Sequence, residues 1–166
     1  MSRGTRVALI FGGLILGLAA PATAQTAVAS LAVAASVARN CSIATTPVAF
    51  GTYDSIVVNA TTSLDGTGSV VVSCTKRAGT RIDLGLGANA SGTTRRMKGT
   101  TDFLTYQLYR NAARSQVWGA GAGAGRNIAR APSRAPRTFT VYGRIAAGQD
   151  VGAASYNDTV VATINF

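Results

Sequence analysis

The sequence predicts an all-β domain built as an antiparallel β-sandwich. Several segments alternate apolar and polar side chains at every second position, which is the period of a half-buried strand. The region after residue 24 is rich in Thr, Val, Ala, Ser and Gly, and apolar residues do not recur there at helical spacing. Turns that contain Gly, Asn and Asp separate the alternating segments, as they do in sandwiches of short strands.

The first 24 residues have the pattern of a secretory signal peptide. Arg3 and Arg6 precede an apolar run from Val7 to Ala20, and Ala22-Thr23-Ala24 forms a small-x-small cleavage site. The run is shorter than the roughly 20 residues that span a bilayer as a helix, so a retained membrane anchor is the less favoured alternative. Cleavage after Ala24 would leave 142 of the 166 residues, which is enough for one domain.

Residues 26–40 form an alternating apolar stretch that has no obvious hairpin partner. One face carries Leu31, Val33, Ala35 and Val37. Two interpretations remain open from the residues alone. The stretch is either an ordinary first strand or frayed terminus of its own domain, or a donor strand that completes the sheet of another copy through backbone hydrogen bonds.

Five later segments have the alternation of strands with one buried face. The inward sets are Val70, Val72 and Cys74; Ile82, Leu84 and Leu86; Leu104, Tyr106 and Leu108; Phe139, Val141, Gly143 and Ile145; and Val160, Ala162, Ile164 and Phe166. The segments between them, 59–68, 87–101 and 119–137, are expected to be loops or short connecting strands. The Gly-rich repeat 119–125 is expected to be the most flexible of them, and no helix is expected there.

Only two cysteines occur, Cys41 and Cys74, and both follow the signal peptide. An even pair in an exported chain predicts one structural disulfide. The close spacing and the histidines that metal or redox sites use are absent from the sequence, so no metal site and no cofactor are expected.

The positive charge does not indicate a nucleic-acid site. Without Arg3 and Arg6, 14 basic residues stand against 6 acidic ones, a net charge of +8. The basic residues are scattered apart from Arg126, Arg130, Arg134 and Arg137, and this segment is broken by prolines and has no aromatic residue for base stacking before Phe139. A solvated basic loop is the favoured interpretation, and a basic surface would also favour adhesion to anionic surfaces.

The order of motifs from Asn40 onward resembles the spore coat protein U domain family. The motifs are NCSI, VAFGTYD (48–54), SVVVSCT (69–75), IDLGLG (82–87), RRMKG (95–99), LTYQLYR (104–110), Trp118-Gly119, VYGRI (141–145) and SYNDTVVATINF (155–166). The resemblance covers essentially the whole chain after the signal peptide, although the long insertion 119–137 does not match the family pattern closely.

This resemblance implies a secreted subunit of an archaic chaperone-usher pilus, associated with surface attachment and biofilm formation. Such subunits are immunoglobulin-like sandwiches that lack their last strand, and their partners are a periplasmic chaperone, an outer-membrane usher and other pilin subunits. On this chain it implies a donor extension at 25–39 and a pilin domain at 40–166. Leu31, Val33, Ala35 and Val37 would then fill a neighbour's groove, while Val160, Ala162, Ile164 and Phe166 would line this subunit's own groove and meet the chaperone.

Two other classes of function compete with that of a fibre subunit. An enzyme is disfavoured because the sequence has no His, no Glu and only two Lys, and its six Asp residues are spread among turns. Asp54 and Asp158 are interpreted as turn and hydrogen-bonding residues rather than a catalytic pair. The second rival is a self-contained secreted coat or adhesive binding protein, which would have to complete its own sheet with residues 26–38.

Overall fold

The computed structural model describes residues 23–166, so the predicted signal peptide lies outside the described residues except for its last two positions. The folded unit comprises residues 36–166. Its elements are β1 (Cys41–Ala49), β2 (Leu64–Cys74), β3 (Thr80–Leu84), β4 (Arg95–Lys98), β5 (Phe103–Tyr109), α1 (Gly121–Ala124), β6 (Arg126–Ile128), β7 (Arg137–Ile145) and β8 (Ala162–Asn165).

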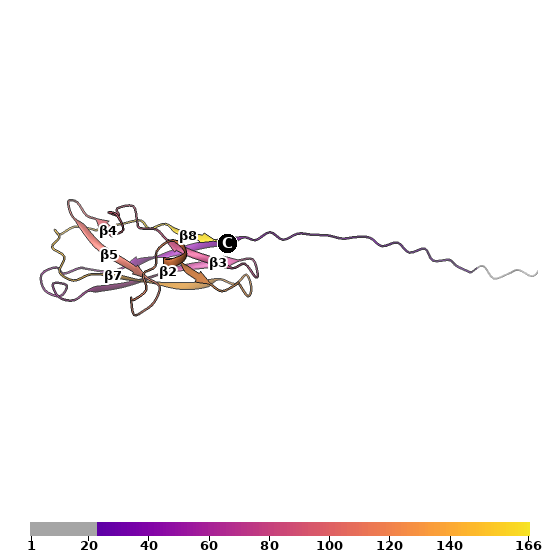
Figure 1. Cartoon of the computed structure of the whole chain (residues 1–166), viewed down its shortest axis with the longest axis horizontal. Coiled ribbons are helices and arrows are strands. Elements are labelled where there is room, and N and C mark those ends of the chain that lie inside the picture. Colours follow the sequence, from indigo (N-terminus) through magenta and orange to yellow (C-terminus); the bar gives the residue numbers. More distant parts are fainter. Residues whose placement is uncertain (1–22) are drawn as a thin grey trace, which may run out of the picture. The chain divides into compact units, whose positions relative to one another are not determined.

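The strands form two antiparallel sheets that enclose one core, which confirms the predicted all-β sandwich (Figure 1). The larger sheet has the order β1-β2-β7-β5-β4, and the smaller one has the order β6-β3-β8. All of the paired strands within each sheet are antiparallel. The five predicted strands correspond to β2, β3, β5, β7 and β8. The short strands β4 and β6 lie in segments that were expected to be loops or short connecting strands, and β1 was not predicted.

The core contains most of the side chains that the alternation predicted to face inward. Among those less than 5% exposed are Val70, Val72 and Cys74 on β2, Ile82 and Leu84 on β3, Leu104 and Leu108 on β5, and Val141 and Ile145 on β7. Trp118 is fully buried among them and donates its indole N–H to the carbonyl of Ile82 at 2.9 Å.

Two inward assignments were wrong, those of Leu86 and of Phe166, which is 52% exposed. Leu86 is 41% exposed because β3 ends at Leu84, so the alternation of β3 does not extend to position 86. Beyond this end the chain bonds irregularly to the C-terminal segment, where the amide of Gly85 donates to the carbonyl of Val161 at 2.9 Å.

The Gly-rich insertion contains a short helical turn that the sequence analysis did not predict. This turn is α1, and β6 follows it and pairs with β3 through Ile82 and Arg126. The guanidinium of Arg126 lies over the rings of Trp118 and Phe139 and donates to the carbonyl of Arg110 at 2.8 Å. Arg126 is therefore a packing residue of the sandwich rather than part of a solvated basic loop.

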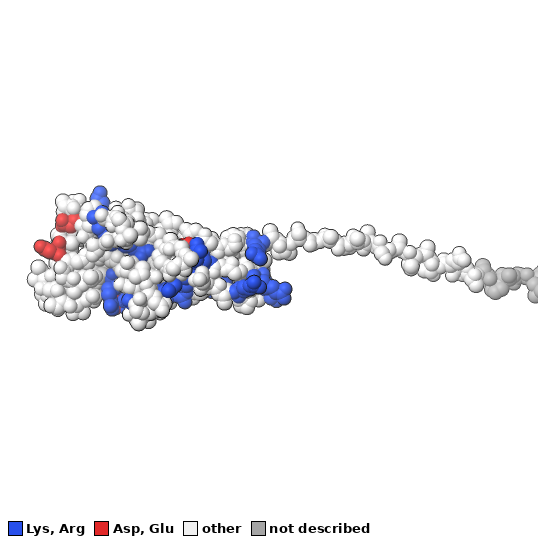
Figure 2. Space-filling model, viewed as in Figure 1, with Lys and Arg blue, Asp and Glu red and all other residues white. Residues whose placement is uncertain are grey.

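Basic side chains are otherwise spread over the visible face of the folded unit, with one group at the end where the chain terminates (Figure 2). Exposed basic residues occur in the turn after β2 and in the loop before β7, among them Arg77 and Arg130. Arg77 and Ala78 of the turn exchange backbone hydrogen bonds of 2.8 and 3.0 Å with Ala131 of the loop, so the two segments lie side by side.

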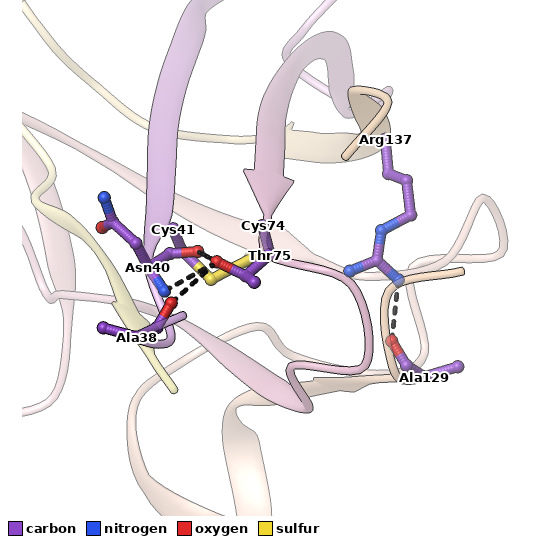
Figure 3. Close-up of a disulfide and its surroundings, with 7 residues drawn as sticks. All are labelled: Ala38, Asn40, Cys41, Cys74, Thr75, Ala129 and Arg137. Carbon is purple, nitrogen blue, oxygen red and sulfur yellow. Dashed lines mark hydrogen bonds between the residues drawn. A yellow bond between two sulfur atoms is a disulfide. The ribbon is translucent and has the colours of Figure 1, made fainter. Parts of the chain in front are cut away.

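The predicted disulfide joins the first two strands. Cys41 and Cys74 lie directly opposite each other in the β1–β2 register and are bonded through sulfur, with 4.1 Å between their Cα atoms (Figure 3). The adjacent Thr75 accepts a hydrogen bond from the amide of Asn40 at 3.0 Å and donates its own amide to the carbonyl of Asn40 at 2.8 Å. The start of β1 is thus fixed to the end of β2 by both covalent and backbone contacts.

We expect removal of the disulfide to destabilise the folded unit strongly. Because the two cysteines are 33 positions apart in the sequence, a Cys41→Ala/Cys74→Ala variant should lose about 3 to 4 kcal/mol of unfolding free energy, as the unfolded chain regains loop entropy. Urea unfolding of the mature protein, followed by tryptophan fluorescence, measures the loss. An unchanged denaturation midpoint would show that the pair does not constrain the fold.

Candidate functional site

The candidate site is a groove between two strand edges that lack a partner. β1 is the outer strand of the larger sheet, and β8 is the outer strand of the smaller one. The two strands lie close together but share no ladder of hydrogen bonds. Unpaired N–H and C=O groups at an edge are a template for an additional strand.

Local sequence explains why β1 remains an edge. Pro47 has no backbone N–H, and the β1–β2 register shifts between Thr46 and Ala49. Proline is tolerated within sheets mainly on edge strands and at such irregularities. The residues of β1 are accordingly half-buried or exposed and not fully covered.

A cavity of about 310 Å³ lies between these edges and reaches the core. Thr45, Thr46, Pro47 and Val48 form one wall, and Val160 and Ala162 form part of the other. The remaining lining residues are Phe50, Ser69, Val70, Leu84, Met97, Tyr106, Leu108, Val141, Tyr156, Asn157 and Asp158. The lining therefore includes core side chains, namely Val70, Leu84, Leu108 and Val141, although these are only 1–4% exposed.

The groove continues beyond the end of β1 into a second hollow of about 870 Å³. The two spaces share lining residues, namely Val48, Phe50, Met97, Tyr156 and Asn157. The second hollow lies between the segments 48–55 and 151–157. Together the two spaces form one trough that leads from the unpaired edges to the loops at the end of the folded unit.

The structure brings together only part of the predicted groove set. Val160 and Ala162 line the cavity, whereas Ile164 packs against the core and is not among the residues that line the cavity. Phe166 follows the end of β8 and is 52% exposed, outside the lining of the cavity. The regular part of the last strand is shorter than the alternation from Tyr156 to Phe166 predicted.

The predicted donor residues are fully available to solvent. Leu31 and Val33 are each 88% exposed, Val37 is 85% exposed, and Ala35 is also exposed. Residues 23–40 contain no helix or strand. A run of large apolar side chains with this exposure is unfavourable in water.

Asp158 anchors the C-terminal wall of the groove. Its carboxylate accepts a hydrogen bond from the hydroxyl of Tyr106 at 2.7 Å and bonds from the backbone and side-chain N–H groups of Asn89 at 3.1 Å each. Burial, reinforced by the bond to Asp158, raises the pKa of Tyr106, which therefore stays a neutral donor. Gly87 has a φ of +94° and leaves no room for a Cβ beside this carboxylate. The hydrogen-bonding role predicted for Asp158 is confirmed.

Arg95 is a site residue that the sequence analysis missed. It is 1% exposed and donates to the carbonyls of Gly85 at 2.7 Å, Trp118 at 2.9 Å and Leu84 at 3.1 Å. It also donates to the side-chain oxygen of Gln107. Burial lowers the pKa of Arg95, while nearby Tyr106 and Asp158 oppose that shift. The guanidinium thus holds the end of β3, the strand on which β8 is built.

Asp83 fixes β8 from the other side of β3. It forms an ion pair with Arg81 at 2.9 Å and accepts a hydrogen bond from the side chain of Asn165 at 3.0 Å. The hydrogen bond from Arg81 is the main cause that lowers the pKa of Asp83. Backbone pairing with β3 runs along the whole of β8, from Ala162 to Asn165, and the carboxylate of Asp83 adds a side-chain contact at Asn165.

Within residues 23–166 the structure shows no grouping typical of a metal centre, because no three Cys, Asp or His side chains come together. Asp54 accepts hydrogen bonds from the amides of Ile56 and Val57 at 3.0 Å each, and these bonds lower its pKa. This confirms its predicted turn role. No helix in that part of the chain is long and apolar enough to cross a membrane.

Known proteins resemble this chain in sequence and in fold. The family model of the Spore Coat Protein U domain matches residues 27–163. Protein U of Myxococcus xanthus is 40% identical over 176 residues, which cover 98% of this chain and 97% of the relative.

Two solved structures give further points of comparison. The first is the CsuC–CsuE chaperone–tip adhesion subunit pre-assembly complex from archaic chaperone-usher Csu pili of Acinetobacter baumannii. One of its chains is similar to this chain with a TM-score of 0.58 and 23% identity, over 78% of this chain and 40% of its own length. The second is the Escherichia coli Hda pilus minor tip subunit, which is similar with a TM-score of 0.41 and 14% identity over 74% of this chain and 79% of its own.

We expect Arg95→Met to destabilise the fold by about 3 kcal/mol, because three carbonyls lose a buried charged donor. Lys98→Met is the matched control, since Lys98 lies on the same strand with an exposed side chain. Thermal unfolding of the two variants measures the difference. Equal midpoints for both variants would contradict a structural role for Arg95.

We expect the Asp83 contacts to make the fold acid-sensitive. A lowered folded-state pKa means that this stability is present above the unfolded-state value near 4 and is lost as pH falls through the folded-state pKa. Asp83→Asn should therefore lower the melting temperature at pH 7, and the gap to wild type should close toward pH 2. A gap that is independent of pH would argue against the ionised pair, and Asp150→Asn at an exposed loop position serves as the control.

Proposed function

The chain belongs to the Spore Coat Protein U domain family, and we propose that it is a chaperone-usher pilus subunit that polymerises by donor-strand exchange. The observation that carries the proposal is the open trough between β1 and β8, whose lining includes core side chains. The same chain carries an exposed alternating apolar arm, which has the pattern that such a trough requires. The proposed role is structural rather than catalytic.

A strand laid in the trough would satisfy both edges together. Its backbone would pair with β1 on one side and β8 on the other, and its inward side chains would enter the cavity between them. Leu31, Val33, Ala35 and Val37 lie on one face of an extended arm, so their spacing matches successive positions along a groove. We propose these four residues as the donor set, with residues 25–39 as the donor extension of the 40–166 domain.

Burial of the arm would supply enough free energy for a stable joint. A fully buried Leu or Val contributes roughly 1.5 to 3 kcal/mol, so Leu31, Val33 and Val37 together contribute about 5 to 9 kcal/mol before ordering costs. The backbone ladder adds to this because it pairs edge groups on the acceptor. Covering the core under the trough contributes further apolar burial on the acceptor side.

The open trough also explains the partners that we propose. An unpaired edge over an accessible core favours aggregation, so the subunit would need a periplasmic chaperone to cover Val160 and Ala162 until a donor arrives. The Acinetobacter baumannii tip adhesion subunit, which has a similar fold, occurs in a pre-assembly complex with a chaperone, and this supports the proposed partner. We further propose export through the periplasm, passage through an outer-membrane usher, and display as a surface fibre that serves adhesion and biofilm formation.

Truncation of the arm tests the proposal. Mature protein would be purified from periplasm with and without residues 25–38, and unboiled samples would be compared by gel electrophoresis and size-exclusion chromatography. We expect multimers that dissociate on heating and that disappear on truncation. A well-folded monomer in both forms would instead support the self-contained coat or adhesive protein.

The alternation of the arm supplies a matched pair of single substitutions. We expect Val33→Asp to abolish the heat-sensitive multimers, because it would bury an unpaired carboxylate in the neighbour's groove. Ala34→Asp, on the opposite face of the arm, should leave them at wild-type level. Gel densitometry of unboiled periplasmic samples compares the two, and equal effects of the two variants would contradict a strand-like insertion in this register.

A further inference from the structure

The turn after β1 exposes three consecutive large apolar side chains. Ile56, Val57 and Val58 are 82%, 70% and 58% exposed, and we call these residues the apolar turn. Single exposed apolar residues are ordinary on protein surfaces, but three in one turn are not covered by anything in the described chain.

The apolar turn is held in this conformation by polar contacts beneath it. The carboxylate of Asp54 accepts hydrogen bonds from the amides of Ile56 and Val57. Asn59 is 3% exposed, and its side chain accepts a hydrogen bond from the amide of Asp54 at 2.8 Å and donates one to the carbonyl of Thr62 at 2.8 Å. The amide of Gly148 donates to the carbonyl of Asn59 at 2.8 Å, which ties a second loop to the turn. The side chains are therefore presented in a fixed arrangement, at little further ordering cost on docking.

A broad hollow of about 680 Å³ lies at the start of β1, over the disulfide. Its exposed surface is mainly apolar, and its lining residues are Asn40, Cys41, Ser42, Ser73, Cys74, Thr75, Lys76, Ser133 and Arg134. We call this the disulfide hollow. Like the apolar turn, it exposes apolar surface that no described part of the chain covers.

The two features lie at opposite ends of β1. The lining of the disulfide hollow includes the first residue of β1, Cys41. The apolar turn lies in the segment beyond the last residue of β1, Ala49. A nine-residue strand separates the two by about 30 Å. In a head-to-tail fibre whose axis runs along β1, the end that carries the start of β1 in one copy meets the far end of the next copy.

Charge at the two ends is complementary. Lys76 and Arg134 line the disulfide hollow, and exposed Arg77 and Arg130 lie in the same two segments. Asp54 precedes the apolar turn and accepts a hydrogen bond from the amide of Ile56. Asp150 is exposed and lies two residues after Gly148, whose amide donates to the carbonyl of Asn59. In Figure 2 the basic group lies at the end that carries the C-terminus, and red carboxylates lie at the opposite end beside one further basic group.

We propose that the apolar turn of one copy docks into the disulfide hollow of the next copy along the fibre. The proposal rests on the proposed polymerisation and adds a second contact to the donor strand. Ile56, Val57 and Val58 cover the apolar floor of the hollow, while Asp54 and Asp150 face Lys76 and Arg134. The trough opens toward the same end as the apolar turn, so an arm that leaves one copy beside its disulfide hollow enters the next copy next to the docked turn.

Site-directed cross-linking tests the docking in assembled multimers of the full mature chain. Val57→Cys and Ser133→Cys are introduced into one chain, and its unassembled and assembled forms are treated with a short bismaleimide. The control chain carries Val57→Cys with Val117→Cys, because Val117 is exposed but lies outside the hollow. Covalent dimers are counted after boiling, which separates the non-covalent joints.

We expect the assembled test pair to give about ten-fold more covalent dimer than the control pair, because docking raises the effective concentration of the two thiols. Equal yields from both pairs would overturn the docking while leaving the heat-sensitive multimers, and hence polymerisation, intact. A chain that forms no heat-sensitive multimers before treatment would overturn both proposals. Excess dimer in an arm-truncated chain would overturn the dependence of docking on the fibre.

A charge exchange separates specific docking from collision. Lys76→Glu/Arg134→Glu should lower the cross-linked fraction of the test pair, since like charges then face each other across the contact. Adding Asp150→Lys to that chain should restore part of the fraction because the signs are complementary again. Failure of the third substitution to raise the yield would contradict the assigned facing of the two ends.

Discussion

The structure depends on two strand edges that the chain leaves unpaired above its own core. β1 and β8 belong to different sheets and border a cavity whose lining includes core residues such as Val70, Leu108 and Val141. A sandwich normally closes this gap with a strand, because the added strand pairs the backbone N–H and C=O groups and removes apolar side chains from water. Other contacts in the chain hold these edges in place, and the arm is the segment that we propose to fit between such edges.

Different interactions hold the two sides of the trough. The β1 side is fixed by the disulfide to β2 and by the paired contacts between Asn40 and Thr75. The β8 side has only four strand residues, so it relies on the buried Arg95 at the end of β3 and on Asp83 at Asn165. Both strands are therefore held by contacts away from the trough. Their edges that face the trough pair with no other strand of the described chain.

Period-two alternation predicted the interior faces of β2, β5 and β7 because these strands are paired on both sides and keep a regular pleat. It failed at Leu86, where β3 has already ended, and at Phe166, which follows the end of β8. The burial of Arg95 could not be predicted from its neighbours, because the carbonyls that satisfy it come from positions 84, 85 and 118. Val160 and Ala162, which the resemblance assigned to a groove, do line the cavity, but the contacts that hold this wall were not predicted.

The connection between arm and domain favours insertion into another copy over self-completion. Asn40 bonds to Thr75, which follows β2, so the last residues before β1 extend the β1–β2 ladder on the side away from the trough. To reach its own trough, the arm would have to reverse direction within residues 38–40 and break these contacts, because the trough borders the other edge of β1. A neighbouring copy could receive the same arm in an extended form, with the Asn40–Thr75 contacts intact. In the proposed assembly, the short tether would therefore disfavour self-insertion and favour a repeating unit.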